Sequence, residues 1–177
     1  IEFLNINSIN ALLKILEEPN YNIFFILIHN NKKILSTLKS RCIDFKISLS
    51  HSKSIEIANK ITNENVNKLI NRDIMNYYLT PGDIVNIINF SKEYKLSLEE
   101  IDLKIFLNIL INDKIYKKET SIKYLIFNFI ENFLRKNLER LTTQNLNEFF
   151  KKINRMKKFN LDEESFFIEF NSKILNG

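Results

Sequence analysis

Arg41 carries the side chain best suited to phosphate chemistry, and it stands in the tripeptide Ser40-Arg41-Cys42. A planar guanidinium placed opposite a transferring phosphoryl group stabilises the charge that spreads over its oxygens. For arginine fingers in general this effect is roughly 10³ to 10⁵ in rate. The alternative is an arginine that forms a salt bridge where a helix meets a strand. The residue types alone leave both interpretations open.

Two histidines and a cysteine are the other candidates for chemistry. His29 has the ring of a general base and forms a potential metal pair with His51, but no third ligand lies at a useful spacing. A polar histidine at a strand end is therefore favoured. Cys42 is the only cysteine, which excludes an internal disulfide and a multi-cysteine zinc site within this chain. Its place at the start of an apolar segment favours a small core residue over a nucleophile.

The composition favours a folded, soluble protein of the reducing cytoplasm. Of 177 residues 45% are apolar, which is enough for a buried core in one or two domains. The 26 basic and 21 acidic residues give a charge of +5, a mild excess that does not by itself indicate nucleic-acid binding. The apolar run 23–28 is too short for a bilayer, and the start lacks a secretory pattern, so we expect no membrane partner.

A helix is expected ahead of this apolar run. Asn7 or Ser8 is the expected cap, and Pro19 ends the helix. Apolar residues recur at intervals of three and four along one stripe: Ile9, Leu12, Leu13 and Leu16.

Two further segments are typical of strands. The unbroken run 23–28 fits a strand covered on both faces, as in a parallel sheet flanked by helices. The segment 42–48 alternates apolar and polar residues, which indicates a half-buried strand. A short helical turn at 32–40 lies between them, so Arg41 is expected at the joint.

Everything after residue 50 has a helical pattern. The helix predicted over 81–94 has a favourable start, because Thr80 is a suitable N-cap residue and Pro81 is favoured at the first helical position. Asp83 lies in the first turn, where the positive end of the helix dipole favours a carboxylate. Four helical segments, over residues 95–113, 120–141, 145–159 and 163–175, predict a bundle of four or five helices. The fold class expected is α/β followed by all-α. The pattern predicts helices over 50–63, from 66 onward, and over 81–94, 95–113, 120–141, 145–159 and 163–175.

Two motifs stand out in this sequence, "NALLKILEEP" at residues 10–19 and Ser40-Arg41-Cys42. They resemble those of bacterial DNA polymerase III clamp-loader subunits, which are of the AAA+ class, and most closely the delta-prime type. In that family an Asn-Ala-Leu-Leu-Lys-x-Leu-Glu-Glu-Pro helix follows the Walker B strand, and Ser-Arg-Cys follows the sensor 1 strand. Both stand here in the family's order, as 10–19 and 40–42. The segment 79–83, "LTPGD", is similar to the family's turn into the lid helix. The motif residues singled out are Asn10, Lys14, Glu17, Glu18, Pro19, Ser40, Cys42, Pro81 and Gly82.

The resemblance implies three domains. Residues 1–49 would be the C-terminal part of the AAA+ ATPase-type domain, 50–95 a helical lid, and 96–177 a helical collar for oligomerisation. The phosphate-binding loop, the Walker B acids and, in many relatives, a zinc module would precede residue 1. We therefore expect that this chain binds no cofactor and does not hydrolyse ATP by itself.

The family also implies a function for Arg41. The arginine would project into the ATP site of a neighbouring subunit, which holds the ATP and Mg²⁺. The chain would be a stator of the clamp loader, with gamma/tau and delta subunits as its partners. Through the assembled ring it would take part in loading the sliding clamp onto primer-template DNA in replication, as part of the DNA polymerase III holoenzyme.

Two departures favour the non-hydrolysing delta-prime role. Where hydrolysing relatives place Thr, Ser or Asn at the end of the sensor 1 strand, only Asn30 is available, one or two residues late. Gly82 and Asp83 stand where those relatives place a sensor 2 arginine, and a carboxylate there would repel phosphate. The alternative is the C-terminal part of an ATP-hydrolysing gamma/tau-type subunit.

The charged residues of the motif helix raise questions of their own. Glu17 and Glu18 lie at the negative end of a helix, which is mildly unfavourable and indicates a partner, either a nearby basic side chain or the adjoining subunit. Lys14 is on the polar side of the helix, where a contact with DNA phosphate is the alternative to a solvated lysine.

The run 151–158, "KKINRMKK", is the densest basic segment, with Lys151, Lys152, Arg155 and Lys158 on one helix face. A solvated or protein-bound face is the favoured interpretation. A stand-alone helical DNA-binding module is the alternative function from another class.

Overall fold

A computed structural model describes residues 4–18, 22–29, 34–139, 143–159 and 162–176 of the chain. The chain divides into two compact units, residues 1–48 and 49–177. Among the described residues, no helix is long and apolar enough to cross a membrane.

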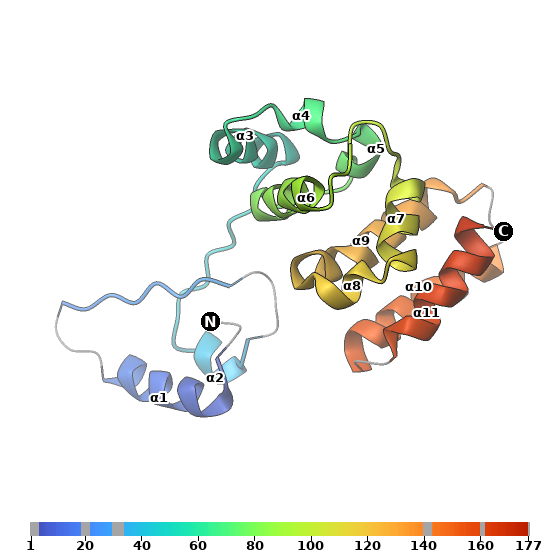
Figure 1. Cartoon of the computed structure of the whole chain (residues 1–177). Helices are drawn as coiled ribbons and strands as arrows, with labels where there is room; N and C mark the ends of the chain where they lie inside the picture. Colours follow the sequence, from blue (N-terminus) through green and yellow to red (C-terminus); the bar gives the residue numbers. More distant parts are fainter. Residues whose placement is uncertain (1–3, 19–21, 30–33, 140–142, 160–161, 177) are drawn as a thin grey trace. The chain divides into compact units, whose positions relative to one another are not determined.

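The first unit is built on α1, Ile6–Glu17, and the single turn α2, Ser36–Lys39, which contact each other (Figure 1). The predicted helix and helical turn are both confirmed. The predicted cap was wrong by two or three positions, because Asn5 is the N-cap and its side chain accepts a hydrogen bond from the Ser8 amide at 2.8 Å. The amide of Ser8 lies at the third helical position, where capping side chains find their donor.

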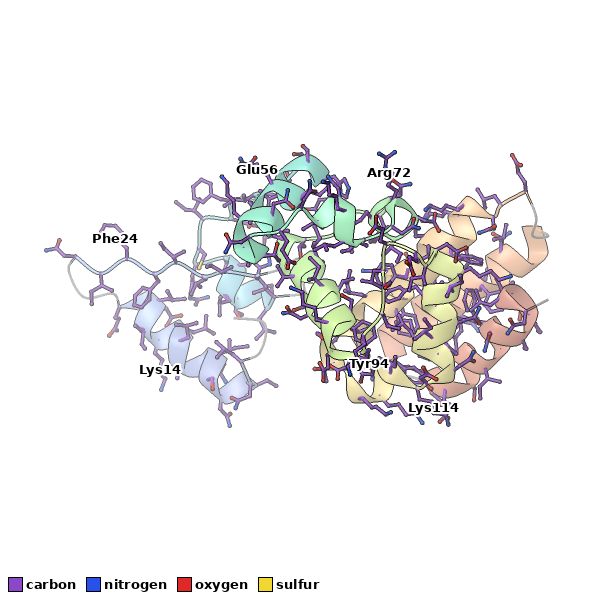
Figure 2. All side chains as sticks on the ribbon, turned by 45° about the horizontal axis from the view of Figure 1, so that its top comes forward. Lys14, Phe24, Glu56, Arg72, Tyr94 and Lys114 are labelled. Carbon is purple, nitrogen blue, oxygen red and sulfur yellow. The ribbon has the colours of Figure 1, made fainter. Side chains whose placement is uncertain are left out.

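Neither predicted strand is present in the described part of the first unit, so the α/β expectation is not met there. Residues 23–29 and 43–50 are extended but form no ladder. Their apolar side chains are open to solvent: Phe24 is 93% exposed and Ile47 87% (Figure 2). A strand takes its hydrogen bonds from neighbouring strands, and the described residues supply none.

The second unit is helical in its described residues (Figure 1). It begins with α3, whose N-cap Ser50 accepts a hydrogen bond from the Lys53 amide at 3.2 Å. The last helix continues into a π-helical segment, η1, that the sequence pattern did not predict. The elements are α3 His51–Thr62, α4 Val66–Leu69, α5 Arg72–Met75, α6 Pro81–Glu93, α7 Leu103–Asn112, α8 Ile115–Lys118, α9 Thr120–Lys136, α10 Thr143–Phe159, α11 Glu163–Phe170 and η1 Asn171–Leu175.

One predicted helix is shorter in the structure than in the sequence pattern. The pattern over 95–113 suggested a single helix, but α7 begins only at Leu103, where the Asp102 side chain accepts a hydrogen bond from the Ile105 amide at 2.8 Å. Lys95, at a φ of 53°, has already left the helical conformation after α6. The cap and this left-handed residue set the two ends of the intervening loop.

The hydrophobic core of the second unit runs through all its larger helices. α6 packs against α3 and α9, α7 packs against α9, and α10 contacts both α9 and α11. Rings from α10 and α11 meet edge to face, with the centroids of Phe149 and Phe170 5.8 Å apart. The largest fully buried aromatic side chains are Phe106, Phe129, Phe149, Phe167 and Phe170. This aromatic core explains the wide apolar stripe of α9, which is covered on more than one side.

Candidate functional site: the arginine between two motifs

The Arg41 side chain lies just after α2 and is held by contacts within its own unit. Its Nη1 atom donates a hydrogen bond to the Thr37 carbonyl at 2.8 Å and lies 3.5 Å from the Ser40 hydroxyl. Its Nη2 atom forms an ion pair with Glu17. About 34% of the Arg41 side chain stays exposed. The salt-bridge interpretation therefore describes its contacts in this chain, while a role at a neighbour's triphosphate stays a prediction.

Glu17 is the residue that joins the two motifs. It is the last residue of α1, and its carboxylate reaches Arg41, 24 residues further along the chain. Of the two partners that the sequence left open for the carboxylates at this helix end, a nearby basic side chain is the one found for Glu17. Its contact offsets the unfavourable position of a carboxylate at the negative end of a helix.

The neighbours of Arg41 in the tripeptide have local roles. The Ser40 hydroxyl donates a hydrogen bond to the Thr37 carbonyl at 3.0 Å, so this carbonyl accepts from both Ser40 and Arg41. Cys42 is a half-buried free thiol. It lies in an irregular segment instead of the strand start that was predicted.

The other polar residues of the motif helix present their side chains to solvent. Asn10, Lys14 and Glu18 are all exposed, and Figure 2 shows Lys14 projecting from α1. A contact of Lys14 with DNA phosphate stays a prediction. Pro19 and the sensor 1 candidate Asn30 lie outside the described residues.

A second polar cluster, which sequence reasoning missed, connects the two extended segments. Asp44 forms an ion pair with Lys39 at 2.9 Å, and its carboxylate lies 3.9 Å from Nε2 of His29. The hydrogen bond and charge of Lys39 lower the pKa of the Asp44 carboxyl from its ordinary value, with a smaller contribution from His29. The polar residues at 29 and 44 thus come together although the predicted strands that carry them do not form a ladder.

The predicted lid turn forms as a helix N-terminus. Thr80 caps α6, Pro81 is its first residue, and Asp83 completes a capping box by accepting a hydrogen bond from the Thr80 amide at 2.9 Å. A Cβ atom added at Gly82 would lie 3.9 Å from its nearest neighbour, the hydroxyl oxygen of Thr80. The local structure therefore explains Asp83 and Pro81 but does not require glycine at 82.

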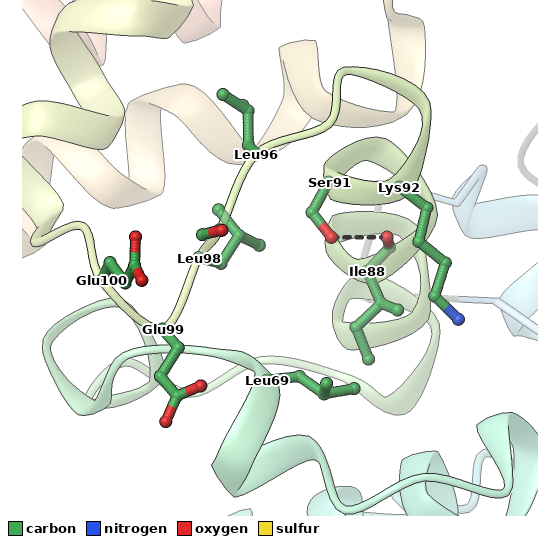
Figure 3. A pocket seen from close by; sticks show the side chains of 9 residues that line it. Leu69, Ile88, Ser91, Lys92, Leu96, Leu98, Glu99 and Glu100 are labelled. Carbon is green, nitrogen blue, oxygen red and sulfur yellow. Dashed lines mark hydrogen bonds between the residues drawn. The ribbon is translucent and has the colours of Figure 1, made fainter.

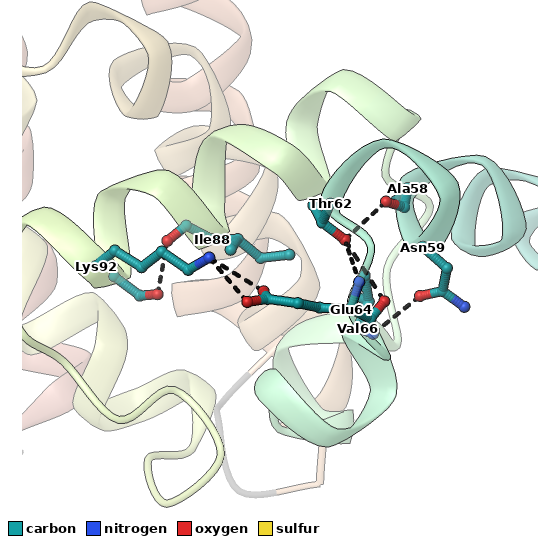
Figure 4. A network of polar contacts seen from close by, with 8 residues as sticks. Ala58, Asn59, Thr62, Glu64, Val66, Ile88 and Lys92 are labelled. Carbon is teal, nitrogen blue, oxygen red and sulfur yellow. Dashed lines mark hydrogen bonds and ion pairs between the residues drawn. The ribbon is translucent and has the colours of Figure 1, made fainter.

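A shallow pocket of about 240 Å³ lies beside α6 (Figure 3). It is lined by Leu69, Ile88, Ser91, Lys92, Leu96, Ser97, Leu98, Glu99 and Glu100. The pocket is smaller than typical ligand sites. The Lys92 ammonium at its edge is 3.1 Å from both carboxylate oxygens of Glu64 (Figure 4). Because Lys92, the lysine that lines this pocket, already has a partner, the pocket offers no unpaired cation to an anionic ligand among its lining residues.

The same network ties the end of α3 to α4. Asn59 accepts a hydrogen bond from the Val66 amide at 2.9 Å, and the Thr62 hydroxyl donates to the Ala58 carbonyl at the same distance (Figure 4). These bonds and the Glu64–Lys92 ion pair connect α3, α4 and α6 into one structural cluster. We assign it no chemical role.

The basic run of α10 is partly neutralised. The Lys152 ammonium contacts Glu148 at 2.6 Å and Glu169 at 2.7 Å, and these carboxylates raise its pKa. Lys151 and Arg155 are exposed, and the side chain of Lys158 lies outside the described set. The buried face carries Phe149, Ile153 and Met156, as predicted. In the described part of this helix, Lys152 is therefore paired with carboxylates, whereas Lys151 and Arg155 remain open to solvent.

No cluster of three or more metal-ligating side chains is found among the residues the structure describes. His29 and His51, weighed as a metal pair, each leave the Nδ1 atom buried without a hydrogen-bond partner among those residues. A histidine pair without further ligands does not make a metal site.

The comparisons with known proteins place the first segment in a definite class. The family model for the delta subunit of DNA polymerase III matches residues 1–51. The delta-prime subunit of DNA polymerase III from Buchnera aphidicola is 47% identical over 60 residues, which are 33% of this chain and 18% of that subunit. The first segment is thus similar to subunits of DNA polymerase III.

The matched segment is similar to both delta-prime and gamma subunits. The delta-prime subunit of Pseudomonas aeruginosa is 49% identical over 43 residues, 24% of this chain and 13% of that subunit. The gamma subunit of Buchnera aphidicola is also similar, at 43% over 56 residues, 31% of this chain and 15% of that subunit. The matches span less than a fifth of each relative. No solved structure matches the chain.

Proposed function

We propose that this chain acts as the delta-prime-type stator of a DNA polymerase III clamp loader in the cytoplasm, and that Arg41 is an arginine finger for a neighbouring subunit. The ATP and Mg²⁺ are held by that neighbour, and gamma/tau and delta subunits are the partners. The assembled ring loads the sliding clamp onto primed DNA. The observation that carries the proposal is the joint presence of the 10–19 and 40–42 motifs within the matched segment.

The geometry of Arg41 supports this role. The side chain is one-third exposed at the end of a short helix, and its three contacts come from within the first unit. A guanidinium has five N–H donors, so these contacts leave donors for the oxygens of a phosphoryl group. The planar fork of arginine suits that geometry better than the point charge of a lysine.

The extended segments of the first unit support an α/β domain in the assembled protein. Residues 23–28 and 43–47 carry apolar side chains that are largely exposed, among them Phe24, Ile26 and Phe45. Contiguous exposed apolar surface of this kind indicates a missing partner. We propose that both segments become strands of a AAA+ sheet, with 50–95 as its lid and 96–177 as its collar.

Reconstitution of the loader tests this function. Partner subunits are mixed with or without the full chain, and complex formation and ATP hydrolysis in the presence of clamp and primed DNA are measured. The proposal predicts that the chain enters the complex stoichiometrically and raises the rate of hydrolysis. A chain that binds DNA but does not join the complex would support the DNA-binding module instead and refute the stator.

The second candidate is an ATP-hydrolysing gamma/tau-type subunit, which is favoured by the 43% identity to a gamma subunit. Nucleotide binding by the full-length protein separates the two functions. Tight, Mg²⁺-dependent ATP binding by the full-length subunit alone would support the gamma/tau type, and its absence would support the stator.

A further inference from the structure

The ion pair between Glu17 and Arg41 joins the last residue of the motif helix to the centre of the Ser-Arg-Cys tripeptide. We propose that Glu17 is a positioning residue for Arg41, whose carboxylate holds the guanidinium in the orientation in which it meets the neighbour's triphosphate. This inference rests on the proposed function of Arg41. It assigns to Glu17 a contribution to the reaction that neither motif reveals separately.

Three contacts from two elements fix the plane of the guanidinium. Nη1 is bound by the Thr37 carbonyl at 2.8 Å and approached by the Ser40 hydroxyl at 3.5 Å, while Nη2 is bound by Glu17. The Thr37 and Ser40 contacts come from α2 and the residue after it, and the Glu17 contact comes from α1. Because the two elements act on different nitrogens, the guanidinium has little freedom to rotate about its own axis.

An arginine side chain that is held in its phosphate-binding conformation before the reaction stabilises the transition state more effectively. A long side chain loses its rotamer freedom when it first binds a phosphate, and support that imposes the bound conformation beforehand removes that loss at the moment of reaction. In the contact with Glu17 both donor and acceptor are charged, whereas in the contact with Thr37 the acceptor is a neutral carbonyl, so the contact with Glu17 is the stronger one. Glu17 is thus the contact whose removal should loosen Arg41 most.

The position of Glu17 on its helix is consistent with this role. A carboxylate in the last turn of α1 faces the negative end of the helix dipole and is unfavourable without a cation nearby. The cation is Arg41, 24 residues away, and not a lysine one turn back on the same helix. The adjacent Glu18 is exposed, and its side chain has no hydrogen bond or ion pair with the described residues. Of the two consecutive glutamates at this helix end, Arg41 thus pairs with Glu17 and not with Glu18.

A purely structural role is the competing explanation. In that case the pair only holds α1 against α2, and its loss lowers stability or assembly without changing the rate of each assembled complex. The distinguishing quantity is the stimulated kcat per assembled loader, measured beside KM. A positioning role changes kcat, because Arg41 acts on the transition state, and leaves KM for ATP nearly unchanged.

The experiment uses the full chain in the reconstituted loader with wild type, Glu17→Gln, Arg41→Ala and the double variant. Glu17→Gln keeps the shape of the side chain and removes its charge. The matched control is Glu56→Gln, which removes a carboxylate whose partners among the described residues are Lys53 and Lys60 on α3. We expect Glu17→Gln to lower the stimulated kcat about tenfold, with KM within about twofold and assembly unchanged. Glu56→Gln should match wild type.

The double variant decides between the outcomes. If Glu17 acts through Arg41, the Glu17→Gln change has no further effect once Arg41 is alanine, so the two losses do not multiply. Wild-type kcat for Glu17→Gln, with a lowered kcat for Arg41→Ala, would overturn the positioning role and leave the proposed function intact. A loss confined to melting temperature or assembly would likewise overturn it in favour of the structural role. Wild-type kcat for Arg41→Ala would overturn the proposed function itself.

Discussion

Lys136 on α9 binds Asp73 on α5 through both the carboxylate and the backbone carbonyl, the latter at 2.8 Å. The same carboxylate accepts a hydrogen bond from the Leu103 amide at the start of α7, at 3.0 Å. One acidic side chain therefore connects three helices of the second unit. These helices come from the segments predicted as lid and collar, so the interaction links parts that the sequence treats as separate.

Replacing Asp73 should destabilise the second unit. Asp73→Ala removes the ion pair and the acceptor for the Leu103 amide, and we expect a loss of about 1–2 kcal/mol in the free energy of unfolding. Urea unfolding of the variant and of wild type gives the difference. The matched control is Asp113→Ala, an exposed residue at the end of α7 whose side chain makes no ion pair with the described residues. Equal losses in both variants would contradict the role of Asp73.

The contribution of Asp73 should also depend on pH. Partial burial acts to raise the pKa of its carboxyl, but the hydrogen bonds from Lys136 and Leu103 and the Lys136 charge lower it overall from 3.8. A folded-state pKa below the unfolded value means that the stabilisation is present above pH 3.8 and is lost as the pH falls through the folded-state pKa. The difference between wild type and Asp73→Ala should therefore shrink in acid.

The capping box of α6 should contribute measurably to stability. Thr80→Ala removes the acceptor for the Asp83 amide, which lies at 3.2 Å, and should cost about 1 kcal/mol. Thr80→Ser keeps the hydroxyl and should retain most of the stability. Thermal unfolding followed by circular dichroism compares the three proteins. Indistinguishable melting temperatures for the alanine and serine variants would show that the cap contributes little.

Glu169 on α11 connects Lys152 on α10 with Lys173 in η1. Its contribution to the stability of the second unit should be sensitive to acid. Its oxygens lie 2.7 and 2.9 Å from Lys152 and 2.8 Å from Lys173, and these cations lower the pKa of Glu169 from 4.5. Its contribution is thus present above pH 4.5 and lost as the pH falls further. We expect Glu169→Gln to cost about 0.5–1 kcal/mol near neutral pH.

The control for this prediction is Glu148→Gln. Glu148 shares Lys152 but is 49% exposed, so its removal should cost less than that of Glu169, which is 26% exposed. Urea unfolding at pH 7 and at pH 3 measures both. A Glu169→Gln loss that persists unchanged at pH 3 would contradict the electrostatic explanation.

Most helices could be predicted because their signals are local. Thr80, Pro81 and Asp83 mark the start of α6 within four residues, and the pattern of α9 identifies its buried face without knowledge of its neighbours. The short helices α5 and α8 were missed, because four residues are too few to show an apolar period. The helix predicted over 163–175 is present, but apolar spacing did not reveal that its last five residues, η1, are π-helical. The start of α7 was misplaced, since apolar periodicity continues across the Asp102 cap.

The strands and the site could be predicted only in part, because both depend on distant partners. The residue composition of 23–28 suits a strand, but a strand forms only beside another. The sequence indicated that a carboxylate at the end of α1 needs a partner, either a nearby basic side chain or the adjoining subunit. It did not identify Arg41, because no local pattern connects residues 24 positions apart. The comparison with clamp-loader subunits supports the family and leaves the role of that arginine to experiment.

The most direct test of the central claim is the stimulated ATPase rate of a loader reconstituted with Arg41→Ala or Arg41→Lys. Both variants should assemble as wild type does. We expect alanine to lower kcat by about 10³ at the neighbour's site, and lysine to recover little of it because a point charge cannot replace the planar fork. A fully assembled Arg41→Ala loader that hydrolyses ATP at the wild-type rate would contradict the claim.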